Sequence, residues 1–196
     1  MRISALKWAL IPLVLLGGIY LYRTVALERS FREIPKTVVN FEALKADGSR
    51  TDYASEKGTA TLIVLSASWC PGCLMEIPML QKFHQEYGSR GLKILMIDED
   101  ENLKVMARFK KAKEMPWTVV HWNYDAMNAL GNPGVIPVSY LVDKEDNIDK
   151  VFVGDASESE LRRRIACLVE HKTASLAVNH NVCSLLFGHF YHTILH

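Results

Sequence analysis

The stretch SASWCPGCLMEIPML, Ser66 to Leu80, carries two cysteines separated by two residues and followed by a glutamate and a proline. Directly before it, Thr61 to Ser66 (TLIVLS) is a β-branched apolar run without alternation, which is typical of a strand buried on both faces. After it, apolar residues recur at three- and four-residue steps until Gly88, as in a helix: Ile77, Leu80, Phe83 and Tyr87. The two thiols are therefore predicted to lie where a central strand passes into a helix.

The position of the cysteines predicts a reactive pair. Cys70 would lie at the helix amino terminus, where unpaired backbone N–H groups and the helix dipole favour an anion, so its thiolate should be stabilised relative to a free cysteine with a pKa of about 8.5. Pro71 fits the first turn, because a proline there costs no helical hydrogen bond. Cys73, one turn further, is expected to be more buried and able to attack a mixed disulfide at Cys70. We interpret Cys70 as the nucleophile and Cys73 as the resolving thiol.

Two other uses of a CxxC pair compete with this interpretation. Half of a zinc site would need a second pair of ligands at suitable spacing, and the other cysteines, Cys167 and Cys183, form no second CxxC. A permanent structural disulfide would close so small a ring that it constrains the unfolded chain little. Redox use is therefore favoured, with no metal assigned to the pair. Copper(I) binding by Cys70 and Cys73 stays open as an alternative.

The segment WCPGCLMEIP, Trp69 to Pro78, resembles the active site of the thioredoxin superfamily, and within it the membrane-anchored, extracytoplasmic TlpA/ResA group. The resemblance extends from about Val38 to about Val169. Trp69 matches the tryptophan before the first cysteine, a candidate substrate-binding residue, and Pro78 matches the proline that kinks the active-site helix. The resemblance implies an α/β fold, namely a thioredoxin-like three-layer sandwich with a mixed central sheet, an N-terminal hairpin and an inserted strand-helix unit. It also implies that the redox-active disulfide works without any other cofactor.

A second match lies in GVIPVSYLVD, Gly134 to Asp143, which resembles the cis-proline loop of this superfamily. The resemblance implies that the Ile136–Pro137 peptide bond is cis and faces the cysteines, so that the Ile136 backbone can pair with the extended chain of a substrate. Both residues are therefore candidate substrate-binding residues. The dipeptide between the cysteines, Pro71-Gly72, reverses the thioredoxin order and leaves the redox poise open.

The carboxylate that would transfer the proton is expected at a different position from that of thioredoxins. Thioredoxins carry a buried aspartate six residues before the first cysteine, where this chain has Val64. Glu76 lies three residues after Cys73, shares its helix face, and matches the glutamate of the TlpA/ResA pattern. Burial near thiols would raise its pKa and let it exchange a proton with Cys73. The alternative is a solvent-facing glutamate that only suits the first turns of a helix.

The rest of the central region alternates strands and helices. Residues 38–53 (VVNFEALKADGSRTDY) are typical of two short strands joined around Asp47-Gly48, which favours a tight hairpin turn. The further elements expected are a strand over 92–97, a helix over 101–114 with Val105, Phe109 and Ala112 on its apolar side, a strand over 116–122, a short helix over 124–130, strands over 138–143 and 148–153, and a final helix from Ser157. This order predicts a three-layer α/β domain with a mixed sheet.

The amino-terminal part of the chain differs from the remainder. Residues 8–22 (WALIPLVLLGGIYLY) form an unbroken apolar run, which reaches membrane-spanning length only if the side chain of Lys7 extends to the membrane surface. We interpret 1–27 as a signal-anchor or transmembrane segment, favouring an uncleaved anchor over a cleaved signal peptide, followed by a linker over 28–36. The thioredoxin-like domain is assigned to 37–169.

The tail over 170–196 fits no part of the family pattern, and its role is left unassigned. On a helix, three histidines would share one face: His189, His192 and His196. Cys183 is close enough in sequence to join them around a soft metal ion, whereas the alternative is an amphipathic or disordered tail that packs on the domain or membrane. Cys167 and Cys183 could also pair with each other in an oxidising compartment.

Composition and family resemblance together define a function. With 196 residues, 49% of them hydrophobic, and a net charge of +1, the chain suits one buried core and lacks the basic clustering of a nucleic-acid-binding protein. The resemblance implies a thiol-disulfide oxidoreductase tethered to the bacterial cytoplasmic (inner) membrane, with its domain facing the periplasm or extracytoplasmic space. It further implies a reductant of exported proteins, such as apocytochrome c, recharged by a transmembrane thiol donor. A disulfide-introducing oxidant and a copper metallochaperone are the alternatives.

Overall fold

The computed structural model of the chain describes residues 14–21, 35–154 and 156–170. Residues 14–21 are helical and expose apolar side chains. Among the described residues, no helix is both long and apolar enough to cross a membrane. Most of the anchor predicted over 1–27, and the tail histidines and Cys183, lie outside the described residues, so the hypotheses about them stay predictions.

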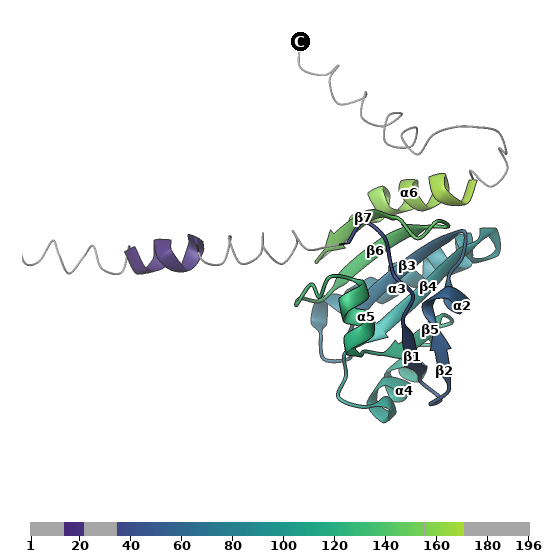
Figure 1. Cartoon of the computed structure of the whole chain (residues 1–196), viewed down its shortest axis with the longest axis horizontal. Helices are drawn as coiled ribbons and strands as arrows, with labels where there is room; N and C mark the ends of the chain where they lie inside the picture. The colour runs from purple at the N-terminus through teal and green to yellow at the C-terminus, as the bar shows by residue number, and fades with distance from the viewer. Residues whose placement is uncertain (1–13, 22–34, 155, 171–196) are drawn as a thin grey trace, which may run out of the picture.

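In the described part of the chain, seven strands form one sheet in the order β2-β1-β5-β4-β3-β6-β7 (Figure 1). Three central strands are parallel: β3 (Ala60–Ser66), β4 (Leu92–Asp98) and β5 (Thr118–His121). The others run antiparallel to their neighbours: β1 (Glu42–Lys45), β2 (Arg50–Asp52), β6 (Val138–Asp143) and β7 (Ile148–Val153). The sheet is therefore mixed, as predicted, and the expected amino-terminal hairpin is present as β1 and β2.

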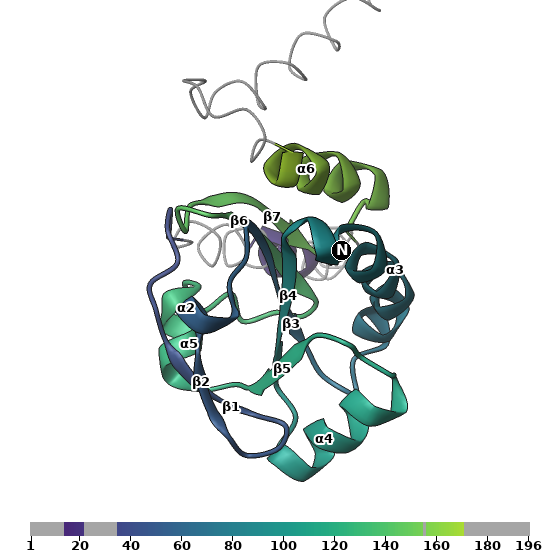
Figure 2. The same cartoon turned by 90° about the vertical axis from the view of Figure 1, so that its right-hand side faces the viewer.

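Helices cover both faces of the sheet and complete three layers (Figure 2). On one face lie α3 (Pro71–Tyr87), α4 (Leu103–Ala112) and α6 (Glu158–Glu170), which share a core with alternate strand residues such as Leu62 and Met96. On the other face, α2 (Tyr53–Glu56) and α5 (Tyr124–Ala129) share a core with the intervening residues, such as Ile63 and Ile97. Because successive side chains of a strand point to opposite faces, burial on both faces explains why β3 is apolar without alternation.

The helix predicted over 101–114 is shorter in the structure. It begins after Asn102, whose side chain accepts hydrogen bonds from two backbone N–H groups of the first turn and so fixes the start of the helix there. Its buried residues are Met106 and Phe109, whereas Ala112, expected on the apolar side, is exposed. The helix is therefore rotated slightly from the predicted face.

Two smaller differences have local causes. The short helix α2 was not predicted, because four residues give no periodicity to detect. Its start is fixed by Asp52, whose carboxylate accepts a hydrogen bond from Ser55 N at 2.8 Å. The final helix begins at Glu158, one residue after the predicted start.

Candidate active site

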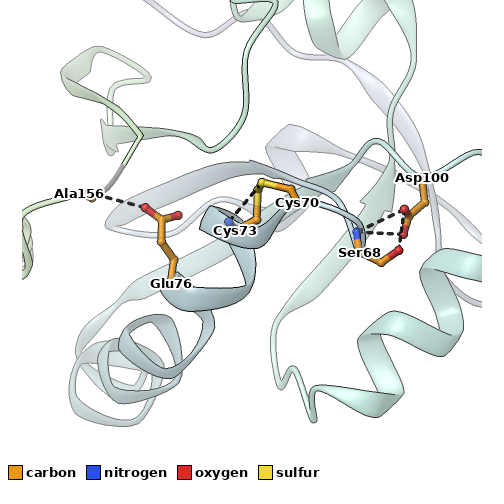
Figure 3. The surroundings of a disulfide bond; sticks show 6 residues. All are labelled: Ser68, Cys70, Cys73, Glu76, Asp100 and Ala156. Carbon is orange, nitrogen blue, oxygen red and sulfur yellow. Dashed lines mark hydrogen bonds between the residues drawn. A yellow bond between two sulfur atoms is a disulfide. The ribbon is translucent and has the colours of Figure 1, made fainter.

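The two cysteines occupy the junction between β3 and α3 and are joined in a disulfide (Figure 3). Their Cα atoms are 5.3 Å apart. Cys70 is the N-cap of α3, and its Sγ accepts a hydrogen bond from Cys73 N at 3.2 Å. Pro71 takes the first helical position, as predicted. Cys70 is 5% exposed and Cys73 2% exposed, so both sulfurs lie at the edge of the buried core.

This geometry favours negative charge at Cys70. When the disulfide opens, the Cys70 sulfur stays at the amino terminus of a helix, where the N–H of Cys73 already points at it. Cys73 lies inside the first turn, with its own sulfur close enough to close the bond again. The arrangement supports a nucleophile at the first cysteine and a resolving thiol at the second.

The loop before β6 lies against the cysteines. The Ile136–Pro137 peptide bond is cis, as the family resemblance implied. A Cβ atom placed on Gly72 would lie 3.3 Å from Pro137 Cδ, so the absence of a side chain at Gly72 allows this close approach. Ile136 packs against the small buried cluster formed by Ala67 and the two cysteines. The structure thus places Ile136 and Pro137 beside the cysteine motif, as the family resemblance implied.

Trp69, the residue before Cys70, is 64% exposed. Met75, on the second turn of α3, is also exposed. These two exposed apolar side chains flank the disulfide in sequence, where a partner has to approach it. The position suits Trp69 to its predicted role in substrate binding.

Glu76 is buried, with only 4% of its surface exposed. Its Oε1 accepts a hydrogen bond from Ala156 N at 3.3 Å, so the carboxylate is directed toward the segment that leads into α6 (Figure 3). The solvent-facing alternative for this glutamate is therefore wrong. Val64, at the position of the thioredoxin aspartate, is buried in the apolar core between sheet and α3.

Two buried aspartates that the sequence analysis missed lie beside the active-site loop. Asp98 ends β4 and is fully buried, in register with Ser66 at the end of β3 and His121 at the end of β5. Its Oδ1 accepts a hydrogen bond from Asp100 N at 3.1 Å. Asp100 is 1% exposed, and its carboxylate accepts hydrogen bonds from both the backbone N–H and the hydroxyl of Ser68 (Figure 3).

Burial shifts the pKa of two acids in this segment, Asp98 and Glu99. Burial raises the pKa of Asp98 to about 7, and the neighbouring carboxylate of Asp100 adds to the rise. Burial also raises the pKa of Glu99. A sequence signal for them exists in hindsight: the acids of MIDED, 96–100, lie at or just after the end of a strand that is parallel to the strand before the cysteines. The carboxyl ends of parallel neighbours meet at one edge of a sheet.

In the ranges 14–21, 35–154 and 156–170, no three histidine, cysteine, aspartate or glutamate side chains are placed so that they could hold a metal ion.

Comparison with known proteins identifies the family. The sequence profile of the Redoxin family matches residues 32–165. Thiol-disulfide oxidoreductase ResA of Bacillus cereus (strain ZK / E33L) is 23% identical over 154 residues, which cover 78% of this chain and 89% of that protein. Sporulation thiol-disulfide oxidoreductase A of Bacillus subtilis (strain 168) is 26% identical over 109 residues, which cover 54% of this chain and 66% of that protein.

Solved structures agree with the sequence relatives. A thiol:disulfide interchange protein of the thioredoxin family from Chlorobium tepidum TLS matches with a TM-score of 0.61 and 26% identity, covering 69% of this chain and 97% of that one. StoA from Bacillus subtilis matches with a TM-score of 0.51 and 23% identity, covering 65% of this chain and 97% of that one. The chain therefore belongs to the Redoxin family, and it is a TlpA/ResA-like thiol-disulfide oxidoreductase of the thioredoxin superfamily whose redox-active disulfide joins Cys70 and Cys73.

Proposed function

We propose that this oxidoreductase is a reductant of disulfides in exported proteins, apocytochrome c among them. It works through the Cys70/Cys73 dithiol with no other cofactor, and a transmembrane thiol donor recharges it. The observation that carries the direction is the setting of Cys70: its sulfur is one helix turn from its partner, and Ser68, two residues before it, is hydrogen-bonded to the buried carboxylate of Asp100.

The reaction consists of two thiol-disulfide exchanges. The Cys70 thiolate attacks one sulfur of the client disulfide; that S–S bond breaks, a mixed disulfide forms, and the second client sulfur leaves as a thiolate that takes up a proton. Cys73, once deprotonated, attacks the Cys70 sulfur, closing the Cys70–Cys73 bond and releasing the other client thiolate, which takes up the second proton. The client gains two electrons and two protons, and the enzyme dithiol loses them.

Glu76 is the group we propose to accept the proton from Cys73. It lies on the same face of α3, three residues further along, and it is a buried carboxylate on the helix that carries both cysteines. A buried carboxylate exchanges protons near neutral pH more readily than an exposed one. Val64 leaves the usual thioredoxin position without a carboxylate, which favours this assignment.

The reducing direction is favoured by a modest stabilisation of the thiolate. A strong oxidant of this superfamily has a reduced form that is stabilised as an anion. In the part of the chain that the structure describes, the Cys70 sulfur accepts a hydrogen bond from Cys73 N. Nearby, the carboxylate of Asp100 is hydrogen-bonded to Ser68 in the loop that leads into Cys70, and negative charge there disfavours a thiolate.

The midpoint potential of the Cys70/Cys73 couple tests this direction. The full chain is equilibrated with glutathione or dithiothreitol buffers, and the fraction of Cys70–Cys73 disulfide is measured by thiol trapping and peptide mass spectrometry. A potential near or below about −250 mV supports a reductant, whereas one near about −120 mV makes the protein an oxidant. Cys73→Ser, which removes the intramolecular couple, is the control. The absence of any reversible couple would favour the copper-binding alternative.

We place the domain on the outer face of the bacterial cytoplasmic membrane, with residues 1–27 as a single-pass anchor. The apolar run over 8–22, the exposed apolar side chains of the described helix 14–21, and the likeness to ResA support this location. A membrane-impermeant maleimide added to intact cells after mild reduction should label Cys70. Labelling that requires lysed cells would place the domain inside the cell and overturn the proposed location.

A further inference from the structure

The active-site loop is held to the rest of the fold at two points. Ser66 O accepts a hydrogen bond from Glu99 N at 2.8 Å, at the start of the loop. Ser68, two residues before Cys70, donates its backbone N–H to the Asp100 carboxylate at 3.2 Å and its hydroxyl to Asp100 Oδ1 at 2.8 Å. Hydrogen bonds to a carboxylate are stronger than those between neutral groups, so the second point is the firmer one.

Asp100 is itself fixed by two strands. Its backbone N–H donates to Asp98 Oδ1 at 3.1 Å, and its carbonyl oxygen lies 2.9 Å from the ring Nε2 of His121 on β5. The Asp100 side chain is buried, so its carboxylate has little freedom to move away from Ser68. The ends of β3, β4 and β5 therefore meet at this residue and form a rigid base for the loop.

The conformation of Cys70 depends on this loop. Cys70 N donates to Ala67 O at 3.3 Å, and Cys70 has the extended backbone of an N-cap, with φ −91° and ψ 109°. Only in such a conformation does the side chain of a cap residue reach the N–H groups of the first helical turn. A shift of Ser68 would move the backbone that enters Cys70, and with it the sulfur that Cys73 N contacts.

We propose that Asp100 is a positioning residue for thiol-disulfide exchange: its carboxylate holds Ser68, and Ser68 holds Cys70 in the N-cap conformation that stabilises the thiolate. This inference concerns the chemistry of Cys70 itself, and it holds for either direction of electron flow. Asp100 also acts on Cys70 as a negative charge, which by itself would destabilise the thiolate. The two effects have opposite signs and can be separated experimentally.

The test is a double-mutant cycle on the rate of Cys70 alkylation. The full chain is reduced, iodoacetamide is added over a range of pH, and peptide mass spectrometry reports the modification of Cys70 alone. Ser68→Ala removes one hydrogen bond to the carboxylate and leaves every charge in place. It is expected to slow alkylation about tenfold below the thiol pKa, and to move the pH profile to higher pH.

The same change is then made in an Asp100→Asn background. There Ser68→Ala is expected to change the rate less than twofold, because the charged acceptor that gave the hydroxyl its effect is gone. If Ser68→Ala leaves the wild-type rate unchanged, or slows the Asp100→Asn protein just as much, Asp100 acts on Cys70 only through its charge and the proposal is wrong.

Two further variants serve as controls for the effect of Ser68→Ala. Ser68→Thr keeps a hydroxyl and should retain the wild-type pH profile. If Asp100→Asn does not fold, the comparison of Ser68→Thr with Ser68→Ala still tests whether the hydroxyl bonded to Asp100 sets the reactivity of Cys70. Ser49→Ala is the matched control, because it also removes a serine hydroxyl bonded to an aspartate, Asp47, at 2.6 Å, on the hairpin between β1 and β2. Its alkylation rate should equal that of the wild type.

Discussion

Asp98 should make the stability of this domain depend on pH in a direction opposite to that of most aspartates. Burial raises its pKa from the ordinary 3.8 to about 7 in the folded protein. Between these two values the folded state holds a proton on Asp98 that the unfolded state has released. Stability therefore falls as the pH rises through this window, because the folded protein must either keep the proton or bury a charge.

The size of the effect follows from the two values. A change in pKa from 3.8 to about 7, at about 1.4 kcal/mol for each pH unit, corresponds to roughly 4 kcal/mol of unfolding free energy. Asp98→Asn removes the titrating group and keeps the shape of the side chain. Relative to the wild type, this variant should therefore gain stability between pH 4 and pH 8, by an amount on the order of 3 to 4 kcal/mol.

Urea denaturation of the oxidised full chain at several pH values between 4 and 8 measures this difference. Linear extrapolation gives the unfolding free energy of each variant at each pH, and comparison with the wild type cancels the titrating groups that do not interact with Asp98. The exposed Glu101, in the loop after β4, offers a matched control: Glu101→Gln also removes a carboxylate, and its difference from the wild type should change little with pH. Parallel pH profiles for Asp98→Asn and the wild type would refute the proposed protonation of Asp98.

Three other outcomes are expected. Glu76→Gln should slow the resolution of a mixed disulfide near neutral pH by about tenfold or more, measured by rapid quench with a model peptide disulfide; an unchanged pH profile would rule out the proton-transfer role. Cys73→Ser should trap mixed disulfides between Cys70 and client proteins in cells, seen as bands that disappear on reduction, and Cys70→Ser should trap none. Phe83→Ala should lower the unfolding free energy by about 3 to 5 kcal/mol in urea titrations, because Phe83 is fully buried between α3 and the sheet; a loss under 1 kcal/mol would contradict that packing.

The elements whose signals are local could be predicted from the sequence. An apolar run predicts β3 and a helical period predicts α3, and the order of these two elements places Cys70 at the start of α3. The predicted start of α4 was less accurate. The side chain of Asn102 binds the first backbone N–H groups of this helix, and apolar periodicity carries no signal for such a cap. The proximity of Pro137 to the cysteines came from family resemblance, since a separation of 64 residues between Cys73 and Pro137 carries no local signal.

The pairing of the two cysteines follows from their spacing alone, because residues one helix turn apart bring their sulfurs together. The partners of the nearby carboxylates, in contrast, depend on how distant parts of the chain pack together. Asp100 lies 32 residues from Ser68 in the chain, and they meet because β3 and β4 are parallel neighbours whose carboxyl ends share one edge of the sheet. The burial of Glu76 likewise depends on the segment before α6, 80 residues away, which supplies the N–H of Ala156. Burial and distant partners set the properties of an acid, and neither can be seen in the residues next to it.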